Sequence, residues 1–186
     1  SSIDNVSAIA VSHGPGSFTG IRIGVSTARA LSQIKGMPCV PVSSLEALAM
    51  RAQLAGEAAA GKLICPILDA RRGQVYCAAF DMSSGEPVRA LPDAALALGE
   101  FLGRLPSGRR LAFLGDGVSL HADAIRAALG ARAAVLPPNL SDLRADAACV
   151  LAQRRPESWV EPARLLPYYL RQPQAERERL AREGGA

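Results

Sequence analysis

Apolar and β-branched runs alternate along this chain with amphipathic segments, and this alternation predicts strands that alternate with helices. In the first third we expect a strand at 6–11, a helix at 19–35, a strand at 39–42 and a helix at 44–55. This order is typical of a mostly parallel sheet with crossover helices. A stretch rich in alanine and glycine at 56–61 is the expected seam between two lobes.

Beyond the seam, the pattern predicts a meander of three strands followed by alternating helices and strands. The expected elements are strands at 63–68 and 75–80, a third strand near Val88, helix 93–102, strand 111–114, helix 120–129, strand 133–136 and helix 141–154. The chain therefore divides into predicted domains at 1–60 and 61–174. Alternating Glu and Arg residues at 175–186 predict a frayed helix or charged tail.

The helix expected at 19–35 carries its strongly polar side chains in one narrow stripe. They recur at i, i+4, i+7 and i+11, as Arg22, Ser26, Arg29 and Gln33. A helix with one polar stripe is covered on most of its circumference. It is either a central helix buried in its own fold or a helix whose second face docks on a partner protein. Small residues at four-residue spacing would allow close packing, namely Gly20, Gly24 and Ala28.

A glycine-rich loop leads into this helix. Backbone N–H groups at such a helix start suit phosphate or another anion, so the loop is a candidate nucleotide or anion site. Its candidate residues are Gly14, Gly16, Ser17 and Thr19. No lysine follows the glycines, and the third glycine comes one position too late for the dinucleotide fingerprint. The hydroxyls of Ser17 and Thr19 are explained more simply as helix caps than as nucleophiles, for which His13 would be the nearest base.

Composition and charge favour a cytoplasmic protein that does not associate with membranes. The chain has 186 residues, of which 49% are hydrophobic and 20% charged, and it has no apolar run near the ~20 residues that span a bilayer. The net charge is +4, but the arginines are scattered and aromatic residues make up only 4%. A tRNA-binding surface needs clustered basic residues, so we expect solvated arginines and only an indirect link to tRNA.

Cysteine and histidine patterns argue against a metal site. The four cysteines have no C-x-x-C spacing and lie in apolar runs, as Cys39, Cys65, Cys77 and Cys149, so reduced core thiols are expected. The two histidines, His13 and His121, lie far apart without an acidic residue at ligand spacing.

Four motifs, in order along the chain, carry a resemblance to a known family. They are Gly-Pro-Gly-Ser-Phe-Thr-Gly-Ile-Arg-Ile-Gly at 14–24, Pro-Val-Ser-Ser-Leu-Glu-Ala-Leu-Ala at 41–49, Asp-Ala-Arg-Arg-Gly-Gln-Val-Tyr at 69–76 and Tyr-Tyr-Leu-Arg at 168–171. With these motifs the chain resembles the TsaB (YeaZ) family. The resemblance implies an α/β protein with the two-lobe actin/Hsp70-like (ASKHA) fold. Family members have a strand hairpin, another strand and a helix before the glycine loop, so we expect the first lobe to be incomplete in this chain.

The resemblance also implies a function without catalysis. TsaB proteins are accessory subunits of the machinery that makes N6-threonylcarbamoyladenosine (t6A) in tRNA, and they dock on TsaD, with TsaE reached through the complex. The helix at 19–35 then becomes the docking helix, and the expected exposed contact residues are Ile21, Arg22, Val25, Ser26 and Arg29. No catalytic or metal residue is expected. ATP or ADP is expected only at the interface with TsaD, and a homodimer when TsaD is absent.

The alternative is a nucleotide-binding ATPase or a peptidase-like enzyme of the same superfamily. Asp69 follows an expected strand where actin-like ATPases place a carboxylate for metal-bound phosphate, and the 115–117 turn lies where that fold approaches adenosine. Arg71 and Arg72 crowd the first position, and Asp116 puts a negative charge at the second. We therefore expect both segments to be structural turns, with Ser43 or Ser44 capping the helix at 44–55 and Glu46 or Glu57 solvated.

Overall fold

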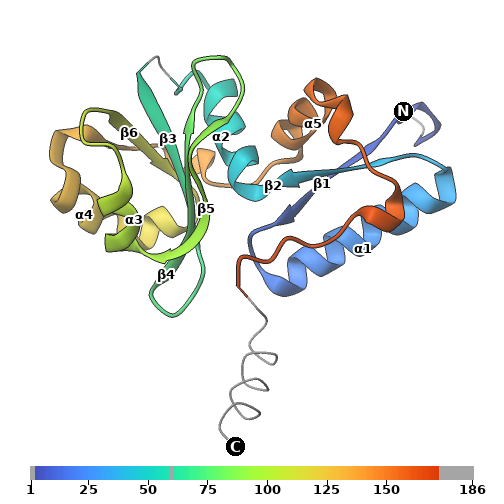
Figure 1. Cartoon of the computed structure of the whole chain (residues 1–186), viewed down its shortest axis with the longest axis horizontal. Helices are drawn as coiled ribbons and strands as arrows, with labels where there is room; N and C mark the ends of the chain where they lie inside the picture. Colours follow the sequence, from blue (N-terminus) through green and yellow to red (C-terminus); the bar gives the residue numbers. More distant parts are fainter. Residues whose placement is uncertain (1–2, 59–60, 172–186) are drawn as a thin grey trace, which may run out of the picture.

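The computed structural model describes residues 3–58 and 61–171, and it has two lobes that lie side by side (Figure 1). In the first lobe, β1 (Ile9–Gly14) and β2 (Cys39–Ser43) form a parallel two-stranded sheet. Alternate β1 residues point to opposite faces, so Ile9 and Val11 pack toward α1 (Phe18–Lys35), whereas Ala10 packs toward α5 (Ala145–Arg154).

The second lobe is a five-stranded sheet in the order β5-β4-β3-β6-β7. Its strands are β3 (Lys62–Asp69), β4 (Gln74–Asp81), β5 (Val88–Ala97), β6 (Arg110–Leu114) and β7 (Ala133–Val135). The meander β3-β4-β5 is antiparallel, while β6 pairs with β3 and β7 pairs with β6, both in parallel. The helices α3 (Leu98–Arg104) and α4 (Gly117–Leu129) cover one face, and α2 (Ser44–Leu54) covers the other.

The helix α2 joins the two lobes because it is buried on both sides. Leu45 and Leu48 pack on the five-stranded sheet, whereas Ala47 and Met50 pack against α5 and β2. The helix α5 belongs to the segment predicted as the second domain, yet its buried side chains pack with those of β2 on the first lobe. The division at residue 60 stays a prediction, and this packing shows that the chain returns to the first sheet after β7.

The element order agrees with the sequence-based expectation, but several bounds do not. The helix expected at 93–102 is wrong in its first half, because residues 94–97 pair with β4 as part of β5 and the helix begins only at Leu98. The strand expected at 6–11 begins at Ile9, and the helix expected at 141–154 begins at Ala145. Short 3-10 helices complete the connections, at Ile3–Asn5, Gly130–Arg132, Pro138–Leu140, Pro156–Ser158 and Pro162–Arg164. The predicted tail at 175–186 lies outside the described residues.

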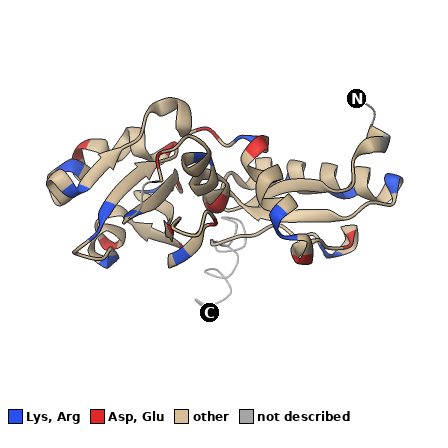
Figure 2. Cartoon of the chain, turned by 90° about the horizontal axis from the view of Figure 1, so that it is seen from above, with Lys and Arg blue, Asp and Glu red and all other residues tan. Residues whose placement is uncertain are grey.

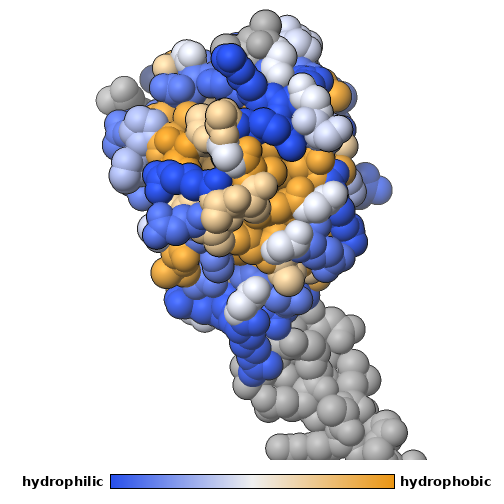
Figure 3. Space-filling model, turned by 90° about the vertical axis from the view of Figure 1, so that its left-hand side faces the viewer, coloured by the Kyte–Doolittle hydropathy of each residue, from blue (hydrophilic) through white to orange (hydrophobic). Residues whose placement is uncertain are grey.

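The surface charges are dispersed. Figure 2 shows Lys and Arg on both lobes, interspersed with Asp and Glu. An apolar patch faces the viewer at the end of the second lobe in Figure 3; on α4 in that lobe, Leu120 is 66% exposed. Among the described helices, none is both long enough and apolar enough to cross a membrane.

Candidate functional site

The helix α1 presents three distinct faces. Its buried face consists of Ile21, Val25, Ala28 and Ser32, which lie toward β1, β2 and the C-terminal segment. The polar stripe predicted from the sequence lies beside this face. On the far side is a row of solvent-exposed, mostly apolar residues, which we call the exposed stripe: Ile23, Thr27, Ala30, Leu31 and Ile34.

The large side chains of the exposed stripe are unusually open to solvent. Ile23 is 63% exposed, Leu31 is 40% exposed and Ile34 is 80% exposed. At about 100° per residue, the stripe lies roughly opposite Val25. Apolar side chains at this helical spacing mark a face that can be buried by another helix. The sequence already contains the pattern of this stripe, as apolar residues at 23, 30, 31 and 34. Because α1 is apolar on more than one side, the pattern alone does not show which side packs on its own sheet.

Two of the predicted contact residues are therefore on the wrong face. Ile21 is 7% exposed and Val25 is 2% exposed, and both pack in the chain's own core with Leu165 and Cys39. Arg22 and Ser26 are exposed and Arg29 is half-buried, so these three border the exposed stripe on its polar side. Close approach also occurs within the fold, because Gly24 lies against Val11 of β1 and Ala28 is buried.

The chain's own C-terminal segment packs closely against the start of the glycine loop. Gly14 has a φ of 133°, and a Cβ added there would lie 2.2 Å from the Tyr168 carbonyl oxygen. Ser17 caps α1, since its Oγ accepts a hydrogen bond from the Gly20 N–H at 3.4 Å. This cap was predicted. The same role for Thr19 is wrong, because Thr19 lies inside the first turn.

We call residues 165–171 the C-terminal strap, which follows the 3-10 helix Pro162–Arg164. The Tyr168 N–H donates to the His13 carbonyl at 2.8 Å, and His13 Nδ1–H donates to the Leu166 carbonyl at 3.0 Å. The His13 and Tyr168 rings stack at 5.6 Å between centroids. Burial lowers the pKa of His13, which favours the neutral ring. His13 is thus engaged by the strap, while Ser17 acts as a cap.

The strap also contacts the start of α1 and the second lobe. Arg22 Nε donates to the Tyr169 hydroxyl at 3.1 Å, and the Arg22 guanidinium lies 3.9 Å from the centre of the Phe18 ring. The Phe18 and Tyr169 rings are 5.0 Å apart. Farther along, Arg171 donates to the Ala70 carbonyl at 2.7 Å, at the end of β3.

A polar cluster between the lobes changes the expected roles at the start of α2. Ser43 has the N-cap position but makes no capping bond; its Oγ donates to Asp93 at 2.9 Å, while the Ser44 and Ser12 hydroxyls are 2.7 Å apart. The side-chain cap predicted for this helix is therefore wrong. The expectation that Glu46 is solvated is wrong as well.

Glu46 is only 8% exposed, and its carboxylate forms ion pairs with two arginines. Arg89 lies 2.7 Å and Arg155 3.2 Å from it. Arg89 also pairs with Asp93 at 2.8 Å. The polar cluster thus connects α2 to β5 and to the segment after α5. Because these charged groups pair with one another, their burial between the lobes costs less free energy.

The structural roles predicted for the two turns of the second lobe are confirmed. Asp69 Oδ1 accepts from the Arg71 N–H at 2.8 Å, and Asp116 Oδ1 accepts from the Asp69 N–H at 2.9 Å. Gly115 is needed for packing, because a Cβ there would lie 2.2 Å from the Ile67 carbonyl oxygen. The glycine that could have approached a nucleotide instead approaches β3.

The four cysteines are free thiols. Cys39, Cys65 and Cys77 are buried free thiols as expected, whereas Cys149 is exposed. Burial raises the pKa of the Cys77 thiol to about 12. Within residues 3–58 and 61–171, no group of three His, Cys, Asp or Glu side chains could hold a metal ion.

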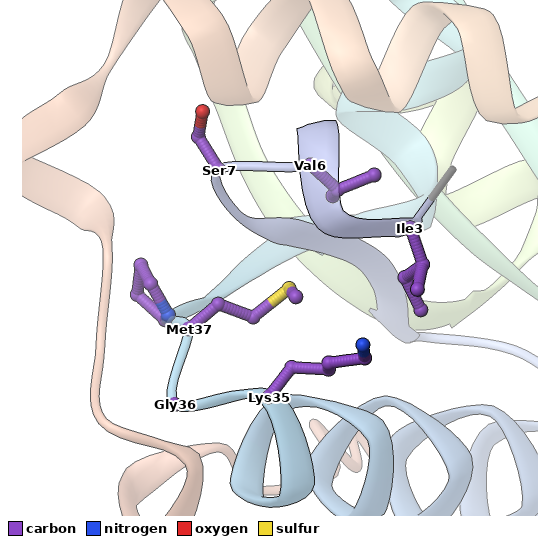
Figure 4. A pocket seen from close by; sticks show the side chains of 7 residues that line it. Ile3, Val6, Ser7, Lys35, Gly36 and Met37 are labelled. Carbon is purple, nitrogen blue, oxygen red and sulfur yellow. The ribbon is translucent and has the colours of Figure 1, made fainter. Parts of the chain in front are cut away.

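The cavities lie at the opposite end of α1 from the glycine loop. One of about 340 Å³ is lined by residues that include Ile3, Val6, Lys35 and Met37, whose side chains surround a common space in Figure 4. A second of about 310 Å³ lies between Gln33 and the 161–163 segment. Neither is lined by the predicted anion-loop residues.

Comparison with known proteins first defines the class. The family model described as TsaD, tRNA N6-adenosine threonylcarbamoyltransferase, matches residues 1–178. With the two-lobed α/β architecture, this match places the chain among proteins of the actin/Hsp70-like type. Similarity to curated relatives is more specific: the chain is 36% identical to the tRNA threonylcarbamoyladenosine biosynthesis protein TsaB of Bacillus subtilis, over 92% of this chain and 72% of that protein. The chain belongs to the TsaB (YeaZ) family.

Other matches agree with this family. The Escherichia coli protein of the same name is 37% identical over 42% of this chain and 33% of its own length. A solved structure from Pseudomonas aeruginosa, described as an uncharacterized protein with similarity to peptidase YEAZ, superposes with a TM-score of 0.76 at 27% identity. That similarity covers 91% of this chain and 76% of the solved one.

Proposed function

We propose that this protein is a non-catalytic subunit of the t6A modification machinery that docks on TsaD and activates it. The names of its relatives support a role in t6A biosynthesis. The observation that carries the docking role is the exposed stripe of α1, with Ile23, Leu31 and Ile34 open to solvent on the face away from their own sheet.

Burial of this stripe would supply much of the binding energy. Fully burying an Ile or Leu side chain contributes about 1.5–3 kcal/mol, so three such residues on one helix face form a sizeable apolar centre. Arg22, Ser26 and Arg29 border that centre, in the arrangement of an apolar core with a polar rim that protein interfaces show. The apolar face of a helix of TsaD is the occupant that we propose.

The remaining partners follow from this docking. TsaE would be reached through the complex, tRNA would be contacted indirectly, and the exposed stripe would self-pair in a homodimer when TsaD is absent. ATP or ADP would not bind the isolated chain, because the strap already fills the space at Gly14. A nucleotide could meet Gly16, Ser17 or Thr19 only at a site completed by TsaD.

The enzyme alternative is not favoured. The Ser17 hydroxyl caps α1, and His13 Nδ1–H donates to the Leu166 carbonyl of the strap. The Asp69 carboxylate accepts a hydrogen bond from the Arg71 N–H within its own turn. Each of these three groups therefore has a structural partner.

An omission assay tests the proposed function. TsaD, TsaE and the enzyme that forms threonylcarbamoyl-AMP are mixed with tRNA, ATP, threonine and bicarbonate, with and without this chain, and modified nucleosides are measured by mass spectrometry. We expect t6A only when the chain is present. Equal product without it would contradict the accessory role, and micromolar ATP binding with turnover by the isolated chain would favour the enzyme alternative.

A further inference from the structure

Within a few residues, the C-terminal strap contacts the core under α1, the start of α1 and the second lobe. Leu165 is fully buried beneath α1, with Ile21 and Val25. Tyr169 then contacts the start of α1 through Phe18 and Arg22, and Arg171 contacts the second lobe at Ala70. Figure 1 shows this segment running alongside α1 and ending between the start of α1 and the second lobe.

From Leu166 to Arg171 the strap lies outside the helices and strands of the described residues. Its path is set by individual bonds, such as that from the Tyr168 N–H to the His13 carbonyl. The polar cluster of Glu46, Arg89 and Asp93 ties the lobes together through α2 and β5, whereas the strap ties them through the start of α1. The two connections are separate, and only the strap contacts α1, the helix that carries the exposed stripe.

We propose that the strap is a brace that fixes the orientation of α1 relative to the second lobe, with Tyr169 and Arg171 as its positioning residues. The inference rests on the proposed function in one respect, because α1 is taken to be the docking helix. When the brace is intact, the exposed stripe is presented in one orientation, so a partner loses less conformational freedom on docking. When Arg171 or the Tyr169 hydroxyl is removed, the start of α1 becomes more mobile and the stripe is presented less uniformly.

Amide hydrogen exchange on the isolated full chain tests the brace without any partner. We compare wild type with Arg171→Ala and Tyr169→Phe, which retains the ring beside Phe18 but lacks the hydroxyl that accepts from Arg22. Arg171→Lys retains a donor for the Ala70 carbonyl and should restore wild-type behaviour. Arg164→Ala is the matched control, since Arg164 is exposed just before the strap. Both brace variants should exchange faster at residues 14–22, whereas β3 and β6 should be unchanged.

Titration of the same variants with TsaD gives the second readout. Loss of one hydrogen bond that orders the docking helix should weaken binding about three- to tenfold, with no change for Arg164→Ala. Unchanged exchange at 14–22, or faster exchange spread over both lobes, would overturn the brace. Faster amide exchange at 14–22 with unchanged affinity for TsaD would contradict the proposal that the brace supports docking. If wild type itself fails to bind TsaD, the proposed function is wrong, and the exchange data still decide the brace.

Discussion

At the residue scale, two positions close together on α1 have opposite environments. Val25 is 2% exposed in the core between α1 and the sheet, and Ile23 is 63% exposed two positions earlier. Both are β-branched apolar residues, so their difference lies in burial and not in chemistry. Substitutions at these two positions therefore distinguish the contribution of α1 to stability from its contribution to partner binding.

Substituting this pair gives a direct prediction. Val25→Arg places a charge in an apolar core and should lower the free energy of unfolding by about 3 kcal/mol or more. Ile23→Arg places the same side chain in solvent and should change it by less than about 0.5 kcal/mol. Urea denaturation followed by circular dichroism measures both variants. Equal destabilisation by the two would mean that the burial pattern of α1 is incorrect.

The pH response of His13 follows from its burial. Burial lowers its pKa in the folded state, whereas an unfolded histidine titrates near ~6.5. The unfolded chain therefore binds more protons as the pH falls below that value, so stability contributed by neutral His13 is present above it and is lost on acidification. His13→Gln replaces the ring by an amide that does not titrate.

Thermal unfolding between pH 7.5 and 5 measures this contribution. The melting temperature of wild type should fall more steeply with decreasing pH than that of His13→Gln. His121→Gln, which removes the histidine on α4 in the second lobe, is the matched control. Parallel curves for wild type and His13→Gln would contradict the assignment.

At the scale of elements, the start of α1 depends on the fit between the glycine loop and the strap. Gly14→Ala would bring a Cβ to 2.2 Å from the Tyr168 carbonyl oxygen at a φ that side chains rarely adopt. The strap must then move, and we expect a loss of about 1–3 kcal/mol. Gly16→Ala meets only an ordinary contact at 3.8 Å and should be nearly neutral. Chemical denaturation of both variants checks this, and similar values would contradict the close packing at Gly14.

Elements with strong local signals were predictable from the sequence, and those that depend on tertiary pairing were not. The cap at Ser17 and the strands flanking the 71–74 turn followed from residue type and pattern. Residues 94–97 looked helical, but pairing with β4 outweighs their local preference. Glu46 looked like a solvated residue near a helix start, and only the fold brings Arg89 and Arg155 to it.

At the scale of the whole molecule, the C-terminal third returns to the first lobe and packs on both faces of its sheet. After β7 the chain returns to the first sheet through α5, and Leu165 fills the core under α1. The sequence indicated two lobes and a docking helix, but the side of α1 that faces solvent depends on this return. That is why Ile21 and Val25 were assigned to the wrong face, while Arg22 and Ser26 were correctly expected to be exposed.

The most direct test of the docking claim is a calorimetric titration of TsaD with this chain and two matched variants. Ile34→Arg changes the most exposed apolar side chain of α1, and Leu120→Arg makes the same kind of change on α4 of the other lobe, at 80% and 66% exposure respectively. We predict that Leu120→Arg binds like wild type and that Ile34→Arg weakens binding by about tenfold or more. Equal affinity for Ile34→Arg and wild type would contradict docking through α1.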